Sequence, residues 1–448
     1  MAAPWDEVVR RLWAELPPRA TSNDGPRLTI GLLAPGQPAD PTGASWDVVN
    51  AGQELAQVLS PGLASDAAVY ADVLRCLPAA QCRRLAAEPA PGGPAEVATA
   101  RAIADCAAVV AFELLGTAAV VRALRAARAA ARLRALVLVP NLEVLDPAGA
   151  RWAPTLGALD LVTVVVAKTA SLVPVLEAWV AATWPRSASR LPTVALVGHC
   201  CPLPVPVPAA AARDTVLHFA GCSGSKNTLA CVRAGVALVR RGLPGARRCV
   251  VCITPKWVPP PEADDNEADL GRRALAGTIY GVPPAALDEI RRLVAANHDV
   301  AELVLPAAPL SEAAKAALYA RGRLALCCSN AEGFGHTILE AAAYGCLVVT
   351  TDGVPMRDVL LTPPARRAAG VRPVALAAPR ARRPAGHGWW YEVDAEAIVA
   401  AAVPLLERAA EATDDEVVAA CVASFAWRQR CLVRGLGALL DGLLPPHE

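Results

Sequence analysis

The residues best suited to chemistry lie close together between positions 332 and 340. The segment from 330 to 351 reads NAEGFGHTILEAAAYGCLVVTT. Gly333 and Gly335 have no side chain, so a ligand can approach the backbone there closely. The residues from His336 to Tyr344 favour a helix, and the N–H groups at a helix start attract an anion. The segment therefore predicts a site for a phosphate group.

Glu332 and Glu340 would lie on two sides of that anion. A helical side chain leans toward the helix N-terminus, so the Glu340 carboxylate would reach hydroxyl groups attached to the phosphate. Glu332, in the loop before the helix, would contact what the phosphate carries on its other side. This arrangement suits a nucleoside-diphosphate sugar, with the ribose at Glu340 and the hexose at Glu332. For Glu340 alone, an ordinary surface glutamate explains the sequence equally well.

Short apolar runs alternate with alanine- and leucine-rich helical stretches along the chain. The strands expected in the first half are 28–34, 109–115, 133–140, 160–167 and 193–198. Those expected in the second half are 216–221, 248–254, 301–306, 323–329, 346–351 and 373–377. Apolar strands separated by helices form parallel sheets covered on both faces. We therefore expect an α/β fold of two Rossmann-like domains facing a cleft, with the loop 330–335 at the carboxyl end of a strand, where such sheets bind ligands.

A proline-rich segment divides the two halves. Pro202, Pro204, Pro206 and Pro208 alternate with other residues, which favours an extended linker. We place an N-terminal domain at 1–205, a C-terminal domain at 206–412 and a helical crossover at 413–448. Thr413, followed by acidic residues, is a good start for the last helix, which we expect to pack back on the first domain.

Composition excludes several classes of protein. The formal net charge is +1 and charged residues make up 19%, which gives no electrostatic reason to expect nucleic acid as a partner. No run of 18 apolar residues lacks charge, proline or glycine, so we expect no transmembrane segment, while contact with a membrane surface stays open. The N-terminal residues lack the apolar core of a signal peptide. The 14 cysteines are scattered, as in a reduced cytoplasmic protein.

No pattern predicts a metal site. The six histidines lack the spacing of zinc ligands. The acidic residues of Asp264-Asp265-Asn266 follow a proline run rather than a strand, which favours a solvated loop. Cys249 and Cys252 form a CxxC inside an apolar run, and residues i and i+3 of a strand point to opposite faces. Two buried thiols are therefore favoured over a shared metal or a disulfide.

Lysine is rare in this chain. Only four of the 43 basic residues are lysine, at positions 168, 226, 256 and 315. Because arginine is used almost everywhere else, a retained lysine indicates a place that needs a compact ammonium rather than a planar guanidinium.

Several of these segments resemble one family. Glu332-Gly-Phe-Gly followed by Glu340 is similar to the E-x7-E motif of retaining GT-B glycosyltransferases of the group 1 or GT4-like family. Further segments look like those of a subgroup found in fungi, algae and large DNA viruses. They are 217–228 (LHFAGCSGSKNT), 333–336 (GFGH), 348–356 (VVTTDGVPM) and, more weakly, 139–143 and 166–169. The resemblance covers the second half well and the first half in patches.

The resemblance implies an activity and a set of site residues. The activity is metal-independent transfer of a sugar from a UDP- or GDP-sugar to a glycan or protein-linked acceptor, with retention. Lys226 would neutralise the donor diphosphate and Glu332 would orient the donor sugar, as the catalytic residues. The residues implied to bind the donor nucleotide are Ser223, Lys226, Asn227, Gly333, Phe334, Gly335, His336, Thr337 and Glu340. Possible acceptor-side residues are Gly36, Asn141, Glu143 and Lys168.

Two other functions stay open. Cys222 stands where the subgroup has an arginine, which would remove one contact to the diphosphate worth about 1.5–3 kcal/mol. A GT-B protein that binds its ligand without turnover is therefore one alternative. The other is a nucleotide-sugar epimerase of the same fold. A dinucleotide-dependent dehydrogenase is disfavoured, because no GxGxxG follows the first strand.

Overall fold

The computed structural model describes 13 ranges of the 448-residue chain. These are 28–34, 80–86, 94–112, 115, 118–140, 153–184, 190–201, 213–220, 224–254, 282–306, 310–360, 372–385 and 388–443. The chain forms two compact units. The N-terminal unit consists mainly of Leu12–Pro202 and Arg428–Glu448, and the C-terminal unit mainly of Leu203–Pro384 and Trp389–Trp427. The predicted boundary at residues 205 and 206 lies outside the described residues.

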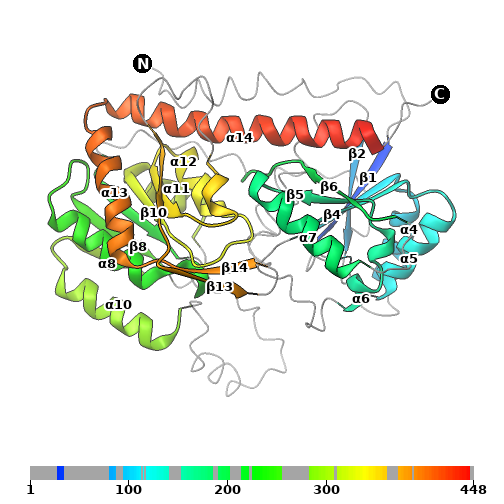
Figure 1. The fold of residues 1–448 in the computed structure, drawn as a ribbon, viewed down its shortest axis with the longest axis horizontal. Coiled ribbons are helices and arrows are strands. Elements are labelled where there is room, and N and C mark those ends of the chain that lie inside the picture. The colour runs from blue at the N-terminus through cyan, green and yellow to red at the C-terminus, as the bar shows by residue number, and fades with distance from the viewer. Residues whose placement is uncertain are drawn as a thin grey trace. The chain divides into compact units, whose positions relative to one another are not determined.

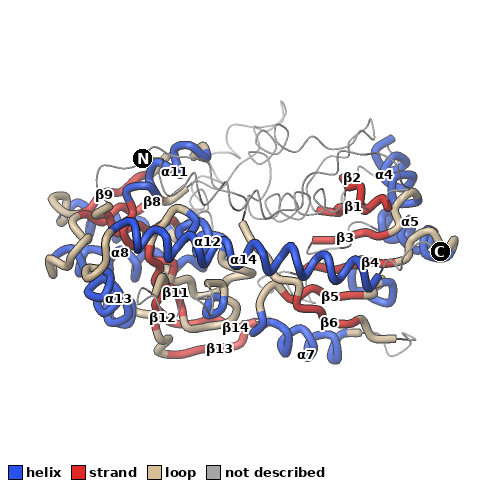
Figure 2. Tube along the Cα trace, turned by 90° about the horizontal axis from the view of Figure 1, so that it is seen from above, coloured by secondary structure: helices blue, strands red, loops and turns tan. Residues whose placement is uncertain are grey.

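The N-terminal unit is built on a six-stranded parallel sheet in the order β2-β1-β3-β4-β5-β6, which Figure 2 shows. Its strands are β1 Leu28–Ala34, β2 Ala80–Ala86, β3 Ala108–Phe112, β4 Ala135–Val139, β5 Val164–Ala167 and β6 Thr193–Leu196. Its connecting helices are α4 Pro94–Ala104, α5 Ala118–Ala129, α6 Ala153–Leu156 and α7 Val173–Thr183. Every residue of β3, β4 and β5 is buried, so these apolar strands form the core of the unit.

The C-terminal unit repeats the plan with a parallel sheet in the order β12-β11-β10-β7-β8-β9. Its strands are β7 Thr215–Phe219, β8 Arg248–Cys252, β9 Ala301–Val304, β10 Gly322–Cys327, β11 Leu347–Thr351 and β12 Val374–Ala377. Its helices are α8 Thr228–Arg240, α10 Pro284–Ala296, α11 Glu312–Arg321, α12 His336–Ala343 and α13 Ala395–Ala409. Helix α13 packs on α8 and on β11 and β12 (Figure 1).

The strand order places the two crossover helices of the site on opposite faces. The chain moves one way along the sheet from β7 to β8 and the other way from β10 to β11. Because parallel crossovers are right-handed, α8 and α12 cover opposite faces, while both begin at the carboxyl ends of neighbouring strands. The prediction of an α/β fold with two Rossmann-like sheets is confirmed.

Helix α14, Asp414–Leu443, contributes to both units. Its start is a capping box, because Thr413 Oγ1 accepts from Glu416 N at 3.3 Å and Glu416 Oε2 accepts from Thr413 N at 2.8 Å. Its second half packs on the N-terminal unit, where a Cβ on Gly435 would overlap the carbonyl oxygen of Val197. The predicted packing of the last helix on the first domain is therefore confirmed.

Some elements differ from the expected ones. Strand β2 has the sequence AQCRRLA, which has no apolar run that would predict a strand. The expected strand 160–167 begins only at Val164, because Leu159–Leu161 forms a 3-10 helix. The two strands β13 Ala381–Ala385 and β14 Gly388–Glu392, which form a hairpin, are not among the expected strands.

The cysteine pair Cys249 and Cys252 lies on β8, with both side chains buried. Burial raises the pKa of the Cys249 thiol to about 12 and that of Cys252 to about 11. Neither thiol forms a disulfide, and the same holds for the other cysteines whose side chains the structure describes. The two residues are therefore core side chains, as the strand pattern predicts.

Candidate active site

The loop after β10 is hydrogen-bonded to neighbouring segments at the carboxyl end of the C-terminal sheet. Asn330 N donates to Ser225 O, after β7, at 2.7 Å. Thr351 Oγ1, at the end of β11, donates to Ser329 O at 2.6 Å. Asn330 also pairs with Tyr391 on β14, giving its side-chain amide to Tyr391 O at 2.6 Å and accepting from Tyr391 N at 2.8 Å. Four segments that are distant in sequence are therefore held together.

Lys226 and Glu332, the two predicted catalytic residues, meet in this place. Lys226 ends a short 3-10 helix, Gly224–Lys226, directly before α8. Its ammonium donates to Glu332 Oε1, and Ser329 Oγ donates to the same oxygen at 2.5 Å. The side chains of Lys226 and Glu332 are 15% and 7% exposed, respectively. Burying a carboxylate costs less free energy when a cation and a hydroxyl pair with it in this way.

The glycines of the loop have a steric role at the start of α12. Gly335 caps the helix with φ +101°, a backbone conformation that L-residues with a side chain rarely adopt. A Cβ there would lie 2.7 Å from Ile338 Cδ1. Phe334 is buried, with its ring 5.5 Å from the ring of His336. Helix α12 thus begins at His336, four residues after Glu332, and the positive end of its dipole lies at this N-terminal end.

Glu340, predicted to bind the ribose, lies on α12 and contacts α11. Its Oε1 accepts from Lys315 Nζ at 3.0 Å and its Oε2 from the Tyr319 hydroxyl at 3.4 Å. Burial raises the pKa of the Glu340 carboxyl, but the charge of Lys315 and its hydrogen bond offset this and hold the pKa below its ordinary value. The carboxylate side chain remains 21% exposed. It is therefore an ionised acceptor with a solvent-accessible side.

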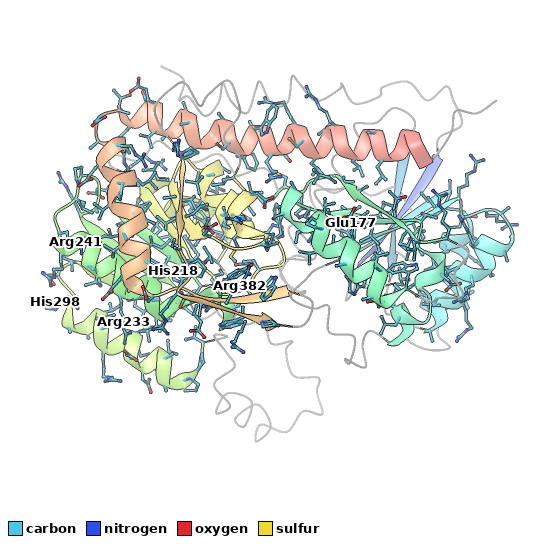
Figure 3. All side chains as sticks on the ribbon, viewed as in Figure 1. Glu177, His218, Arg233, Arg241, His298 and Arg382 are labelled. Carbon is cyan, nitrogen blue, oxygen red and sulfur yellow. The ribbon has the colours of Figure 1, made fainter. Side chains whose placement is uncertain are left out.

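Asn227 has a structural contact in addition to its predicted one. It adopts a left-handed conformation, φ 53°, at the start of α8, and its amide donates to Val393 O at 2.8 Å. Oγ1 of the next residue, Thr228, lies 3.2 Å from Nε2 of the buried His218, which is labelled in Figure 3. His218 Nδ1 bonds to Leu326 O at 2.8 Å, so this turn is fixed to β10. Contact of Asn227 with a nucleotide stays a prediction.

The remaining predicted residues are placed only in part. Lys168 follows β5 in the N-terminal unit and is 3% exposed. Thr337 lies in the first turn of α12. The residues Ser223, Cys222, Gly36, Asn141 and Glu143 and the stretch 264–266 lie outside the described residues. The structure therefore brings Lys226 and Glu332 into contact and places Glu340 on the helix that follows, while the roles of the donor-side and acceptor-side residues stay predictions.

Three residues of the site were missed in the sequence analysis. Ser329 holds Glu332, while Lys315 and Tyr319 hold Glu340. The rarity of lysine was a usable signal for Lys315. Nothing in the local sequence identifies Ser329 or Tyr319, because their partners are set by how the loop and the two helices pack.

The hairpin beside the loop presents aromatic rings stacked with arginines. The Arg382 guanidinium, labelled in Figure 3, lies 4.8 Å from the ring centre of Trp389, and that of Arg383 lies 5.2 Å from Trp390. Such cation–π pairs between neighbouring strands stabilise a short hairpin. Through Tyr391, this hairpin supports Asn330 and hence the position of Glu332.

Comparison with known families finds one match. Residues 292–364, which include Lys315, Glu332 and Glu340, match the model of the family described as glycosyl transferases group 1. No curated protein sequence matches the chain significantly. Among the described helices, none is long and apolar enough to cross a membrane.

Solved structures are similar to this chain at low sequence identity. The apo structure of OtsA is 10% identical and has a TM-score of 0.51, over 94% of this chain and 100% of that one. Sucrose-phosphate synthase from Thermosynechococcus elongatus is 14% identical, with a TM-score of 0.44, over 93% of this chain and 99% of that one. The pneumococcal O-GlcNAc transferase GtfA is 14% identical, with a TM-score of 0.44, over 76% of this chain and 57% of that one.

The fold is that of the GT-B glycosyltransferases. Within it, residues 292–364 match the family model described as glycosyl transferases group 1.

Proposed function

We propose that the protein is a retaining glycosyltransferase that moves a sugar from a nucleoside-diphosphate sugar to a hydroxyl of a glycan or protein-linked acceptor. The meeting of Lys226 with Glu332 at the start of α12 carries this proposal. The ammonium and the helix start suit a diphosphate, and the carboxylate suits sugar hydroxyls. The match of residues 292–364 to a glycosyl transferase family supports it.

The proposed chemistry relies on electrostatic stabilisation of the leaving group. The bond between the sugar C1 and the phosphate oxygen breaks, and negative charge develops on the diphosphate. Lys226 and the N–H groups at the start of α12 stabilise that charge, which lowers the barrier because the interaction strengthens as the charge grows. The acceptor hydroxyl attacks C1 from the same face and gives its proton to the departing phosphate. No side chain is assigned as a nucleophile.

In this proposal, Lys226 binds the diphosphate while it keeps its ion pair with Glu332. The ammonium donates to Glu332, and a diphosphate oxygen would accept from another of its three N–H donors. Ser329 holds the same carboxylate oxygen independently. The other oxygen of Glu332 is then directed by this fixed geometry toward a donor sugar. The Lys226 ammonium and the Glu332 carboxylate would then bind the same nucleoside-diphosphate sugar, at its diphosphate and at its sugar respectively.

We further propose that the reaction needs no divalent metal, because Lys226 and the helix start take the metal's electrostatic role. The acceptor is assigned to the N-terminal unit, at Gly36, Asn141, Glu143 and Lys168. A cytoplasmic location is proposed on the free thiols of the described cysteines.

A donor screen tests the proposal. UDP-, GDP- and ADP-sugars are added in turn, and thermal unfolding identifies the donor, since a ligand at 100 times its Kd stabilises by about 2.7 kcal/mol. Release of nucleoside diphosphate is then measured with and without candidate glycans, and the anomeric configuration of the product by NMR. We expect acceptor-dependent release with retention, unchanged in EDTA.

Other outcomes favour the other functions. Conversion of the donor to its epimer without transfer would identify an epimerase. A thermal shift without any turnover would identify a binding protein. Loss of turnover in EDTA, restored by manganese or magnesium, would refute metal independence alone.

A further inference from the structure

Lys315 lies outside the predicted site but contacts one of its main residues. It is on α11, and its ammonium donates to Glu340 Oε1 on α12 and pairs with Glu312 one turn earlier, both at 3.0 Å. The Lys315 and Glu340 side chains are each 21% exposed, whereas that of Glu312 is 54% exposed. The pair with Glu340 is therefore the shielded one, where an ion pair has more effect than at the surface.

Tyr319 holds the other oxygen of the same carboxylate. Its hydroxyl donates to Glu340 Oε2 at 3.4 Å, a long and hence weak bond. The Tyr319 ring is 1% exposed and is fixed between Tyr344, stacked at 5.3 Å, and Phe219, at 4.5 Å. Two donors from α11 thus define the direction of the Glu340 carboxylate, and a carboxylate has about four lone-pair sites, so some remain for a ligand.

We propose that Lys315 is a positioning residue that holds the Glu340 carboxylate ready to accept hydrogen bonds from the ribose hydroxyls of a nucleoside diphosphate. This inference rests on the proposed function, because it takes the ligand of Glu340 to be a ribose. Lys315 itself acts through Glu340. A lysine suits this place because its compact ammonium bridges two carboxylates, in a chain where nearly every other cation is arginine.

The test compares two ligands on each variant. The probes are the nucleoside diphosphate that the wild type binds, among UDP, GDP and ADP, and its 2′,3′-dideoxy analogue, which lacks the ribose hydroxyls. Affinities are measured by titration calorimetry. We expect Lys315→Met to weaken the nucleoside diphosphate about tenfold, the loss of one charge-assisted contact, and to leave the dideoxy analogue unchanged. Lys315→Arg, which retains the charge, should lie closer to the wild type.

Two further variants guard the result against a folding defect. Glu312→Gln breaks the outer ion pair only, so it should bind both probes as the wild type does. Tyr319→Phe removes one hydroxyl and keeps the ring stack, so it should weaken only the nucleoside diphosphate, by less than Lys315→Met. If Lys315→Met does not fold, Tyr319→Phe and Lys315→Arg decide the outcome on the same two probes.

The pH dependence of nucleoside-diphosphate affinity distinguishes a positioning role of Lys315 from a role in stability alone. The groups that face Glu340 are Lys315 and Tyr319 on α11 and His336 on its own helix. Without Lys315, burial raises the pKa of the carboxyl, so affinity for the nucleoside diphosphate should fall with decreasing pH sooner in Lys315→Met than in the wild type.

Each contrary result has a definite meaning. Equal losses on both probes, or identical pH profiles in wild type and Lys315→Met, would overturn the role of Lys315 and leave the proposed function standing. Failure of the wild type to bind any nucleoside diphosphate would overturn the proposed function, and this inference with it.

Discussion

Lys226 and Glu332 depend on each other, so a change in one residue acts on both. The Lys226 ammonium is the cation beside the buried Glu332 carboxylate, and without it Ser329 is the one described residue that would still donate a hydrogen bond to that carboxylate. Removing one partner of a buried pair leaves an uncompensated charge, which costs about 3–5 kcal/mol. Effects on ligand binding and on stability must therefore be measured separately.

The first prediction concerns Lys226. Lys226→Ala should weaken a nucleoside diphosphate at least tenfold and the matching nucleoside little, because only the diphosphate needs the ammonium. Titration calorimetry with both ligands checks this. The double variant Lys226→Ala with Glu332→Gln should regain stability, since no buried charge is left unpaired, while diphosphate affinity stays low. Equal losses for nucleoside and nucleoside diphosphate would contradict the role of Lys226.

The second prediction separates the two glutamates by steady-state kinetics. Glu340→Gln should raise the donor KM several-fold with little change in kcat, because the ribose does not change during the reaction. Glu332→Gln should lower kcat about 10- to 100-fold, because its partner is the sugar whose bond breaks. It should bind the bare nucleoside diphosphate as tightly as the wild type or more so, since Lys226 loses a competing carboxylate.

The opposite pattern would show that the roles are reversed. This would be loss of nucleotide binding in Glu332→Gln together with unchanged binding in Glu340→Gln.

Sequence reasoning found the residues of this site better than it found their partners. The spacing of Glu332, Gly335 and Glu340 follows from a loop and a helix start, which are local features, and the structure places them as expected. Lys315 and Ser329 act through contacts made when the helices and loops pack, and no local pattern reports such contacts. The Asn227 amide, expected at a ligand, also donates to Val393 O for the same reason.

Elements were predictable where burial decides their sequence. Strand β1 has its expected bounds, and β3, β4 and β5 are buried throughout, as their apolar runs require. Strand β2 contains two arginines and β13 contains two arginines and a proline, so neither has an apolar pattern. Strand β2 lies at the edge of its sheet and β13 pairs with β14 in a two-stranded hairpin. In such places hydrogen bonding to one neighbouring strand, rather than burial of apolar side chains, defines the strand.

The third prediction tests the link between α11 and α12 through pH. The lowered pKa of Glu340 stabilises the folded protein above the unfolded pKa of a glutamate, and this stabilisation is lost as the pH falls through the lowered folded value. Lys315→Met should therefore reduce the free energy of unfolding by about 1–2 kcal/mol at pH 7, with a difference that shrinks as the pH falls and vanishes once Glu340 is protonated in the folded wild type.

Urea unfolding between pH 7 and pH 3 measures this difference. Glu312→Gln is the control, because its exposed pair with Lys315 should contribute only about 0.2–0.5 kcal/mol. A Lys315→Met deficit that stays constant over the whole range would mean that lost packing, and not charge, is responsible.

At the scale of the molecule, α14 belongs to two units. Two glycines in its second half allow its packing on the N-terminal unit to be tested by substitution, one as the test and one as the control. A Cβ at Gly435 would overlap the carbonyl oxygen of Val197, whereas a Cβ at Gly437 would meet no atom within 4 Å. Gly435→Ala should therefore lower stability by about 1–3 kcal/mol, because the helix must move away from the strand end. Gly437→Ala should leave stability unchanged or raise it by up to about 1 kcal/mol, through better helix propensity.

Thermal unfolding of both variants checks the fourth prediction, with hydrogen exchange on β6 to locate the effect. Exchange should accelerate on β6 in Gly435→Ala alone. Equal stability of the two variants would mean that α14 does not rest on Val197 in solution.

The dual membership of α14 also has a consequence for biosynthesis. Its residues from Arg428 onward are translated after every strand of both sheets, yet they complete the N-terminal unit. Until they leave the ribosome, Val197 and Gly198 lack the helix that covers them in the finished protein. The N-terminal unit, although most of it is synthesised first, therefore cannot complete its folding until the end of α14 is synthesised. Until then its uncovered apolar surface can bind chaperones or neighbouring nascent chains.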